Sequence, residues 1–225
     1  SHLMKIVLFL CFLLSSTLFL MAQNDCSPDD VILTSQVEVD DFVTNSNNCD
    51  RIIGNLTIGN PDLSGPTDIT DISGLKNINS ILGDLVILLN SQLKDLDGLQ
   101  NLRNIGGLLD ITGNDQLKDL DGLVSLSSVG GNLVILSNSQ LEQIDGLKKV
   151  SKINGDLLIQ SNNQLRNLDG LKNITRIDGT LDILRNLGQL SNLDGLQNLT
   201  SIGGSLLIRT NSPLDNLDGL QNLSS

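Results

Sequence analysis

A unit of 24 residues decides the fold, and one copy of it reads LDGLQNLRNIGGLLDITGNDQLKD at residues 96–119. The glycine at its third position recurs at Gly74, Gly98, Gly122, Gly146, Gly170, Gly195 and Gly219. The spacing is 24 residues at every step except one, from Gly170 to Gly195, where it is 25. A fixed period of this length is typical of a solenoid, in which each repeat buries its apolar residues against its neighbours. The sequence therefore predicts one elongated repeat domain.

Each unit also contains a short strand with the pattern Gly-x-Leu-x-Ile. The copies run over residues 83–87, 107–111, 131–135, 155–159, 179–183 and 204–208. Alternate side chains of a strand point to opposite faces, so we expect the Leu and Ile to point inward and the residue between them outward. Stacked about 4.8 Å apart, these segments predict a continuous parallel sheet along one side. We expect the glycine where φ is positive or where a neighbouring chain leaves no room for a Cβ.

An asparagine follows each of these isoleucines by three residues. The column consists of Asn90, Asn114, Asn138, Asn162, Asn186 and Asn211. Buried asparagines can pair the backbone groups that a corner leaves without partners, coil after coil. We therefore expect a structural ladder, in preference to a sugar-binding one.

Composition narrows the function classes. The chain carries 26 acidic and 14 basic residues, a formal net charge of −12 and a pI of about 4.2, which disfavour nucleic acid and anionic lipid as partners. Its one histidine, His2, lies in Ser1-His2-Leu3, which we interpret as an expression scar at residues 1–3. Without another histidine the chain has no Ser-His-Asp triad and no His-based zinc site. The sequence therefore predicts a non-enzymatic protein without a cofactor.

Residues 4–22 have the pattern of a secretory signal peptide. A basic start at Lys5 is followed by an apolar run over residues 6–20, and small residues near Ala22 offer a cleavage site. A membrane-spanning helix is the alternative, but the run is shorter than the ~20 residues that a span needs. We therefore expect a secreted or cell-surface protein whose mature chain has no membrane span.

Residues 23–50 are expected to cap the solenoid. Cys26 and Cys49 are the only cysteines after the signal, and in an oxidising compartment we expect them to pair, with a reactive thiol or metal pair as the alternative. Between them, residues 31–33 read as a strand, and the capping-box pattern at residues 35–38 opens a short amphipathic helix. The solenoid then occupies residues 51–225, with no visible C-terminal cap.

The cap and the coils together resemble a known family. The segment NNCDRIIGNLTI at residues 47–58, preceded by Cys26 and followed by LDGLxNLxxIxGxLxI coils, is similar to the opening of a receptor L domain. Such domains are related to leucine-rich repeats and form the ligand-binding lobes of the epidermal-growth-factor and insulin receptor families. The resemblance covers Cys26 to the C-terminus and implies a right-handed β-helix with a short capping helix and a Cys26–Cys49 disulfide. The signal ending resembles those of secreted Bacteroidetes proteins. The chain lacks the furin-like region, the later membrane span and the kinase of those receptors, so growth-factor binding does not carry over.

The outer face of the expected sheet is the main candidate binding surface. The outward positions give Val86, Leu88, Asp110, Val134, Leu136, Leu158, Asp182, Leu184 and Leu207. A contiguous apolar patch on a secreted protein indicates a surface that binds protein. The alternative is that β-forming residues occupy a strand and shield one another.

An aspartate ladder is the second candidate. Asp97, Asp121, Asp145 and Asp169 stack one coil apart, and Asp194 and Asp218 continue the series. Such carboxylates repel unless they are solvated, hydrogen-bonded or bridged by a cation, and calcium suits oxygen ligands. The alternative, which we prefer, is that they accept backbone N–H groups at a turn, because the companion position two residues earlier changes from Asp to Asn along the chain.

These observations favour a recognition or adhesion module that binds a protein or carbohydrate ligand through the sheet face. Two alternatives remain open. One is a structural solenoid that self-associates through its uncapped C-terminal coil, and the other is a calcium-dependent surface protein.

Overall fold

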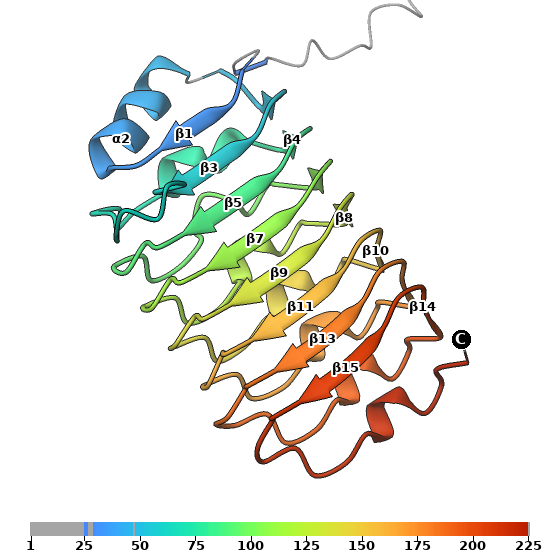
Figure 1. Ribbon diagram of the computed structural model, residues 1–225. Coiled ribbons are helices and arrows are strands. Elements are labelled where there is room, and N and C mark those ends of the chain that lie inside the picture. Colours follow the sequence, from blue (N-terminus) through green and yellow to red (C-terminus); the bar gives the residue numbers. More distant parts are fainter. Residues whose placement is uncertain (1–24, 27–28, 47, 225) are drawn as a thin grey trace, which may run out of the picture.

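The computed structural model describes residues 25–26, 29–46 and 48–224. The expected expression scar and signal peptide lie outside the described residues. Two parallel sheets run the length of the molecule and are connected by corners and short 3₁₀ helices, so the chain is a parallel β-solenoid, as the repeat predicts (Figure 1). Among the described residues, no helix is long and apolar enough to cross a membrane.

The long sheet has eight strands, each paired with the equivalent strand of the next coil. They are β1 (Val31–Leu33), β3 (Leu56–Gly59), β5 (Leu85–Leu88), β7 (Leu109–Thr112), β9 (Leu133–Leu136), β11 (Leu157–Gln160), β13 (Leu181–Leu184) and β15 (Leu206–Arg209). β1, which precedes the repeats, forms the first strand of this sheet. The expected cap therefore contributes a strand as well as a helix.

The second sheet has seven strands of two residues each. They are β2 (Arg51–Ile52), β4 (Ser80–Ile81), β6 (Asn104–Ile105), β8 (Ser128–Val129), β10 (Lys152–Ile153), β12 (Arg176–Ile177) and β14 (Ser201–Ile202). The 3₁₀ helices are η1 (Ser73–Asn77), η2 (Asp121–Leu123), η3 (Asp145–Leu147), η4 (Asp169–Leu171), η5 (Asp194–Leu196) and η6 (Asp218–Leu220). Five of these begin at the aspartate of an Asp-Gly-Leu motif.

Leucine and isoleucine fill the space between the sheets and the 3₁₀ helices. In the coil that contains β7, Leu109, Ile111, Leu117 and Leu120 are all 0% exposed. Because every coil contributes the same set, the core is one continuous apolar column that each coil completes for its neighbour.

The asparagine ladder lies at the corner that follows each long strand from β5 to β15. Asn138 Nδ2 donates to the Ile111 carbonyl of the preceding coil at 2.9 Å, and Asn138 Oδ1 accepts from the Asn114 backbone N–H at 3.0 Å. The other ladder asparagines donate to the equivalent carbonyl in the same way. At the N-terminal end the Thr67 hydroxyl donates to Asn90 Oδ1 at 2.6 Å and takes the place of an asparagine.

The residue before each ladder asparagine has a left-handed backbone. Gly113 occupies this position in one coil with φ of 70°, and Ser137 and Arg185 occupy it in others with φ of 56°. A non-glycine residue is strained in this conformation by about 1–2 kcal/mol, so the corner must be held by other contacts. The glycines of the Gly-x-Leu-x-Ile pattern serve the other expected purpose, close approach: a Cβ on Gly179 would lie 2.2 Å from Asp156 Oδ1 of the preceding coil.

The N-terminal cap covers the first coil. Helix α2 (Gln36–Asn45) has Ser35 as its N-cap, whose Oγ accepts from the Glu38 N–H at 3.3 Å. Val39 is buried, and Phe42 and Val43 pack against the core. Cys26 and Cys49 form a disulfide. At the opposite end, Leu206 and Leu217 are 41% and 53% exposed, whereas their equivalents one coil earlier, Leu181 and Leu193, are fully buried.

The ladder gives a direct test of the fold. Replacing Asn138 with Ala removes the partners of the buried Ile111 carbonyl and Asn114 N–H, so we expect unfolding in urea to lose about 2–5 kcal/mol of stability. Gln140→Ala, an exposed change in the same coil, should stay within about 0.5 kcal/mol of the parent. An Asn138→Ala variant as stable as the Gln140→Ala variant would show that the ladder does not hold the corner.

Candidate functional site

The outward positions of the long sheet form two columns whose members pair directly between neighbouring strands. The first column contains Thr57, Val86, Asp110, Val134, Leu158, Asp182 and Leu207. The second contains Gly59, Leu88, Thr112, Leu136, Gln160, Leu184 and Arg209. The nine residues expected to form one surface therefore lie on one face of the long sheet, which we call the outer face. Figure 1 shows the strands that carry it.

Exposure differs along the outer face. Val86, Val134, Leu136, Leu158, Leu184 and Leu207 are half-buried, as expected for apolar side chains that stand on a sheet beside one another. Leu88 is only 7% exposed and Asp182 only 8%, so neither contributes the open surface that its outward position predicts. The accessible apolar part of the outer face thus centres on β9, β11 and β13.

Asp182 is the most unusual residue of the outer face. It lies between Leu158 and Leu207 in the first column. Its Oδ2 accepts from Arg209 Nη2 at 3.0 Å and from Gln160 Nε2 at 3.3 Å. Its Oδ1 is buried and has no hydrogen-bond partner within the described part of the chain. Burying a carboxylate oxygen without a hydrogen-bond donor costs free energy, so Asp182 would be stabilised by an additional donor.

Asp110 is the second carboxylate of the same column. It accepts a hydrogen bond from the Thr112 hydroxyl, two residues along β7. Burial raises the pKa of Asp110, and the bond from Thr112 offsets this only in part. Val86 and Val134 flank it in the column, so its charge is set among aliphatic side chains.

The aspartate ladder lies on the other side of the coil, at the 3₁₀ helices. Its turn chemistry belongs mainly to the companion column: Asp119 Oδ1 accepts from the Asp121 N–H at 3.0 Å, and Asn167 Oδ1 accepts from the Asp169 N–H at 3.0 Å. Burial, Asp119 and Asp145 raise the pKa of Asp121, in that order. Lys148 Nζ lies 2.6 Å from Asp145 Oδ2 and places a positive charge in the ladder. The described residues contain no group of three acidic, His or Cys side chains arranged to hold a metal ion.

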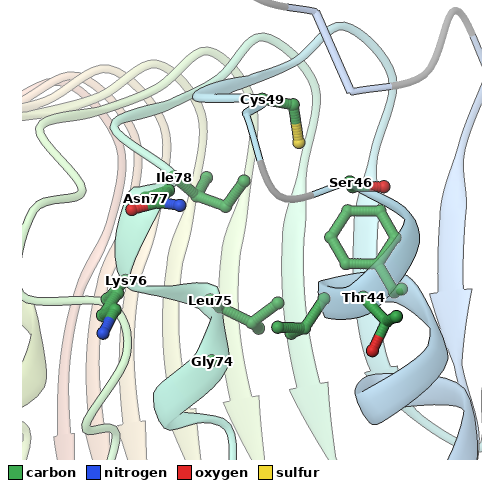
Figure 2. A pocket seen from close by; sticks show the side chains of 10 residues that line it. Thr44, Ser46, Cys49, Gly74, Leu75, Lys76, Asn77 and Ile78 are labelled. Carbon is green, nitrogen blue, oxygen red and sulfur yellow. The ribbon is translucent and has the colours of Figure 1, made fainter.

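One apolar concavity of about 390 Å³ lies where α2 meets the first regular coil. Cys49, Leu75 and Ile78 point into it, whereas Lys76 points away (Figure 2). Phe42 and Val43 of α2 also line it, and the lining surface is mainly apolar. We therefore interpret it as a gap in the packing between the cap and the solenoid, because among the described residues it lacks the convergent polar groups of a ligand-binding pocket.

Two further ladders escaped the sequence analysis. Side chains that precede the inward Leu of each long strand accept the N–H of the next coil: Asn55 accepts from Asp84, Asn132 from Asp156, and Asp156 from Thr180. On the 3₁₀ side, Asn101, Asn173, Asn198 and Asn222 donate to a carbonyl one coil earlier. The sequence does contain a pattern for the first of these ladders, because Asn, Asp and Thr recur directly after the glycine of the Gly-x-Leu-x-Ile segments.

The comparisons with known proteins agree with this architecture. A family model described as the receptor L domain matches residues 48–121 and 127–186, together more than half of the chain. This chain belongs to the receptor L domain family. The match begins in the cap beside Cys49 and extends through the coils that carry Asp110, Leu158 and Asp182, so the outer face of this receptor L domain is part of the matched region. A search of curated proteins found no match.

Asp110 makes the stability of this receptor L domain depend on pH. The folded-state pKa of Asp110 is raised, so the folded state loses stability as the pH rises from about 4 through that pKa. Asp110→Asn keeps an acceptor for Thr112 without the charge. We expect the variant to be more stable than the parent at pH 7 and to lose that advantage at pH 3, as measured by urea midpoints.

Asp215→Asn is the matched control, because it removes one charge at an exposed position. It corrects the comparison for the change in net charge. An advantage of Asp110→Asn that is equal at both pH values would contradict the desolvation of this carboxylate.

Proposed function

We propose that this receptor L domain is a secreted or cell-surface recognition module that binds a protein or carbohydrate ligand through its outer face. Receptor L domains are non-enzymatic recognition domains, and this supports the class of function. The observation that carries the proposal is the outer face itself. Half-buried aliphatic side chains from neighbouring strands lie beside a buried carboxylate that has an unused oxygen.

The disulfide supports an extracellular location, because such bonds persist in oxidising compartments. The proposed mature chain begins at Gln23, after a signal peptide at residues 4–22. A Bacteroidetes-like origin is part of the same proposal and rests on the resemblance of the signal sequence.

A ligand on the outer face would bury the aliphatic rows and leave polar groups at the rim, as protein interfaces do. Arg209, whose side chain is 54% exposed, borders the apolar centre from β15, and Gln160 supplies a polar group within it, between Leu136 and Leu184. The 3₁₀ side offers no comparable surface among the described residues, since its aspartates and lysines alternate with solvent-exposed turns.

The test is a substitution in the centre of the face. Leu136 lies between Thr112 and Gln160 in its column, so Leu136→Asp introduces a charge without an acidic neighbour there. We expect the variant to lose at least tenfold in affinity for any ligand selected from panels of extracellular proteins and glycans, because an apolar contact becomes a desolvated charge.

Val124→Asp is the control, since Val124 is an apolar residue, 48% exposed, beside η2 on the other side of the coil. It should bind as the parent does, and both variants should keep the parent's circular dichroism spectrum. Equal binding by the Leu136→Asp variant would move the ligand site off the outer face.

The alternative function, self-association through the coil that contains β15, is tested by the size of the particle in solution. Light scattering on residues 23–225, with calcium and with a chelator, should show growth with protein concentration if this is correct. A monomer at all concentrations would exclude it, and growth only with calcium would favour the calcium-dependent alternative.

A further inference from the structure

The outer face contains two carboxylates in one otherwise aliphatic stretch. Asp110, Val134, Leu158 and Asp182 are consecutive members of the first column and pair strand to strand from β7 to β13. Three steps between strands separate the two carboxylates, which corresponds to about 14 Å. The two apolar residues fill the interval.

Each carboxylate is ionisable and poorly solvated. Asp182 is 8% exposed, and its Oδ1 lacks a hydrogen-bond donor among the described residues. Asp110 is half-buried, and in the described part of the chain the Thr112 hydroxyl is its one hydrogen-bond donor. Burying a carboxylate costs free energy that only a donor or a cation can offset. Both positions are therefore complementary to groups that donate hydrogen bonds and carry positive charge.

Arg209 shows that the site accepts such a group. Its guanidinium reaches Asp182 Oδ2 from β15 at 3.0 Å and leaves Oδ1 unused, and its side chain is 54% exposed, so it can move aside. No basic residue lies beside Asp110 in either column among the described strands, where its neighbours are Val86, Val134 and Thr112. The formal net charge of −12 adds long-range attraction for a cationic partner.

The spacing restricts the shape of the partner. An extended chain advances about 3.4 Å per residue, so side chains four residues apart are about 14 Å apart and point to the same side. The residue midway between them points to that side too. Placed along the column, an extended segment with the pattern basic-x-apolar-x-basic would set its two cations at Asp110 and Asp182 and its apolar residue over Val134 and Leu158.

We propose that the outer face binds an extended, basic segment of a partner protein, anchored by Asp110 and Asp182 and packed on Val134 and Leu158. This inference rests on the proposed function and names its partner class. In this proposal the two carboxylates determine the specificity, and Val134 and Leu158 supply apolar contact area.

The experiment uses the peptide acetyl-TRTLTRT-amide and the disulfide-bonded chain from residue 23 to 225. Methyl NMR spectra report on Val134 and Leu158 directly and detect binding at millimolar affinity. We expect the methyl signals of Val134 and Leu158 to shift with added peptide, and the shifts to shrink as salt is raised. The matched peptide acetyl-TQTLTQT-amide should bind with an affinity at least about tenfold lower, because it lacks the two cations.

Asp110→Asn and Asp182→Asn keep the size of each side chain and remove its charge. Each should weaken the arginine peptide about tenfold and leave the glutamine peptide nearly unchanged. The exposed change Asp215→Asn should bind the arginine peptide within about twofold of the parent.

Three results would overturn the proposal: no shift of Val134 or Leu158 at millimolar peptide, equal binding of the two peptides, or Asn variants that bind as the parent does. None of these decides the proposed function, which fails only if Leu136→Asp leaves ligand binding intact. Loss of ligand by Leu136→Asp with no preference for the arginine peptide would mean that the outer face recognises another class of partner.

Discussion

The hydrogen bond from each ladder asparagine to the isoleucine carbonyl of the preceding coil is the interaction on which the structure depends. A solenoid must turn sharply after every strand, and a turn leaves buried backbone groups that require partners. Here the chain turns through a left-handed residue, which is strained when it is Ser137 or Arg185 rather than Gly113. The buried amide of the next residue bonds both neighbouring coils and holds that conformation. Each of these corners thus contains one left-handed residue and one asparagine whose hydrogen bonds hold it in place.

This pairing also fixes the register of the long sheet. Each asparagine binds one particular carbonyl, so a coil cannot slide along its neighbour without leaving an amide unsatisfied. With the register fixed, residue 110 lies beside residue 134 and residue 158 beside residue 182. The inward positions are confined to leucine and isoleucine by the core, whereas the outward positions vary from valine to aspartate. The chemistry of the outer face can therefore change without affecting the fold.

The sequence predicted the fold well because the repeat encodes it locally. The 24-residue period, the Gly-x-Leu-x-Ile strands and the capping box before α2 each specify an element from neighbouring residues, and the structure contains all three. The two additional ladders were visible only in part, since Asn, Asp, Thr and even Leu108 alternate at the same position. Asn, Asp and Thr share a side-chain acceptor at the right distance, which the periodicity of apolar residues does not report, whereas Leu108 has no such acceptor and only donates its N–H to Asp84.

Exposure at the candidate site was less predictable. Asp182 and Leu158 have the same outward position, yet Asp182 is buried because Arg209 and Gln160 extend over it from adjacent strands. Gln160 is 22 and Arg209 is 27 positions away from Asp182 in the chain. Whether a long side chain covers its neighbour depends on both residues and on the strands that carry them. A sequence pattern that treats each position separately does not predict such a contact. The same reason explains why the unused oxygen of Asp182 emerged only with the structure.

The two sets of aspartates differ in how the fold offsets their charge. Those near the 3₁₀ helices lie in successive coils, where like charges repel, and Asp119 and Asp145 raise the pKa of Asp121. That side of the coil limits the repulsion by exposure to water, by Lys148 and by the change from Asp119 to Asn167 in the companion column. Asp110 and Asp182 are three coils apart, so they do not repel one another strongly. Asp110 lies between Val86 and Val134, and Asp182 lies between Leu158 and Leu207 with Arg209 and Gln160 bonded to one oxygen only. Burial of these two carboxylates costs desolvation free energy, and neither carboxylate contributes to the core or supports a turn. A carboxylate held at that cost on an outward face gains stability from any further cation or hydrogen-bond donor that reaches it, and this links the electrostatics of the outer face to the role in recognition that we propose for it.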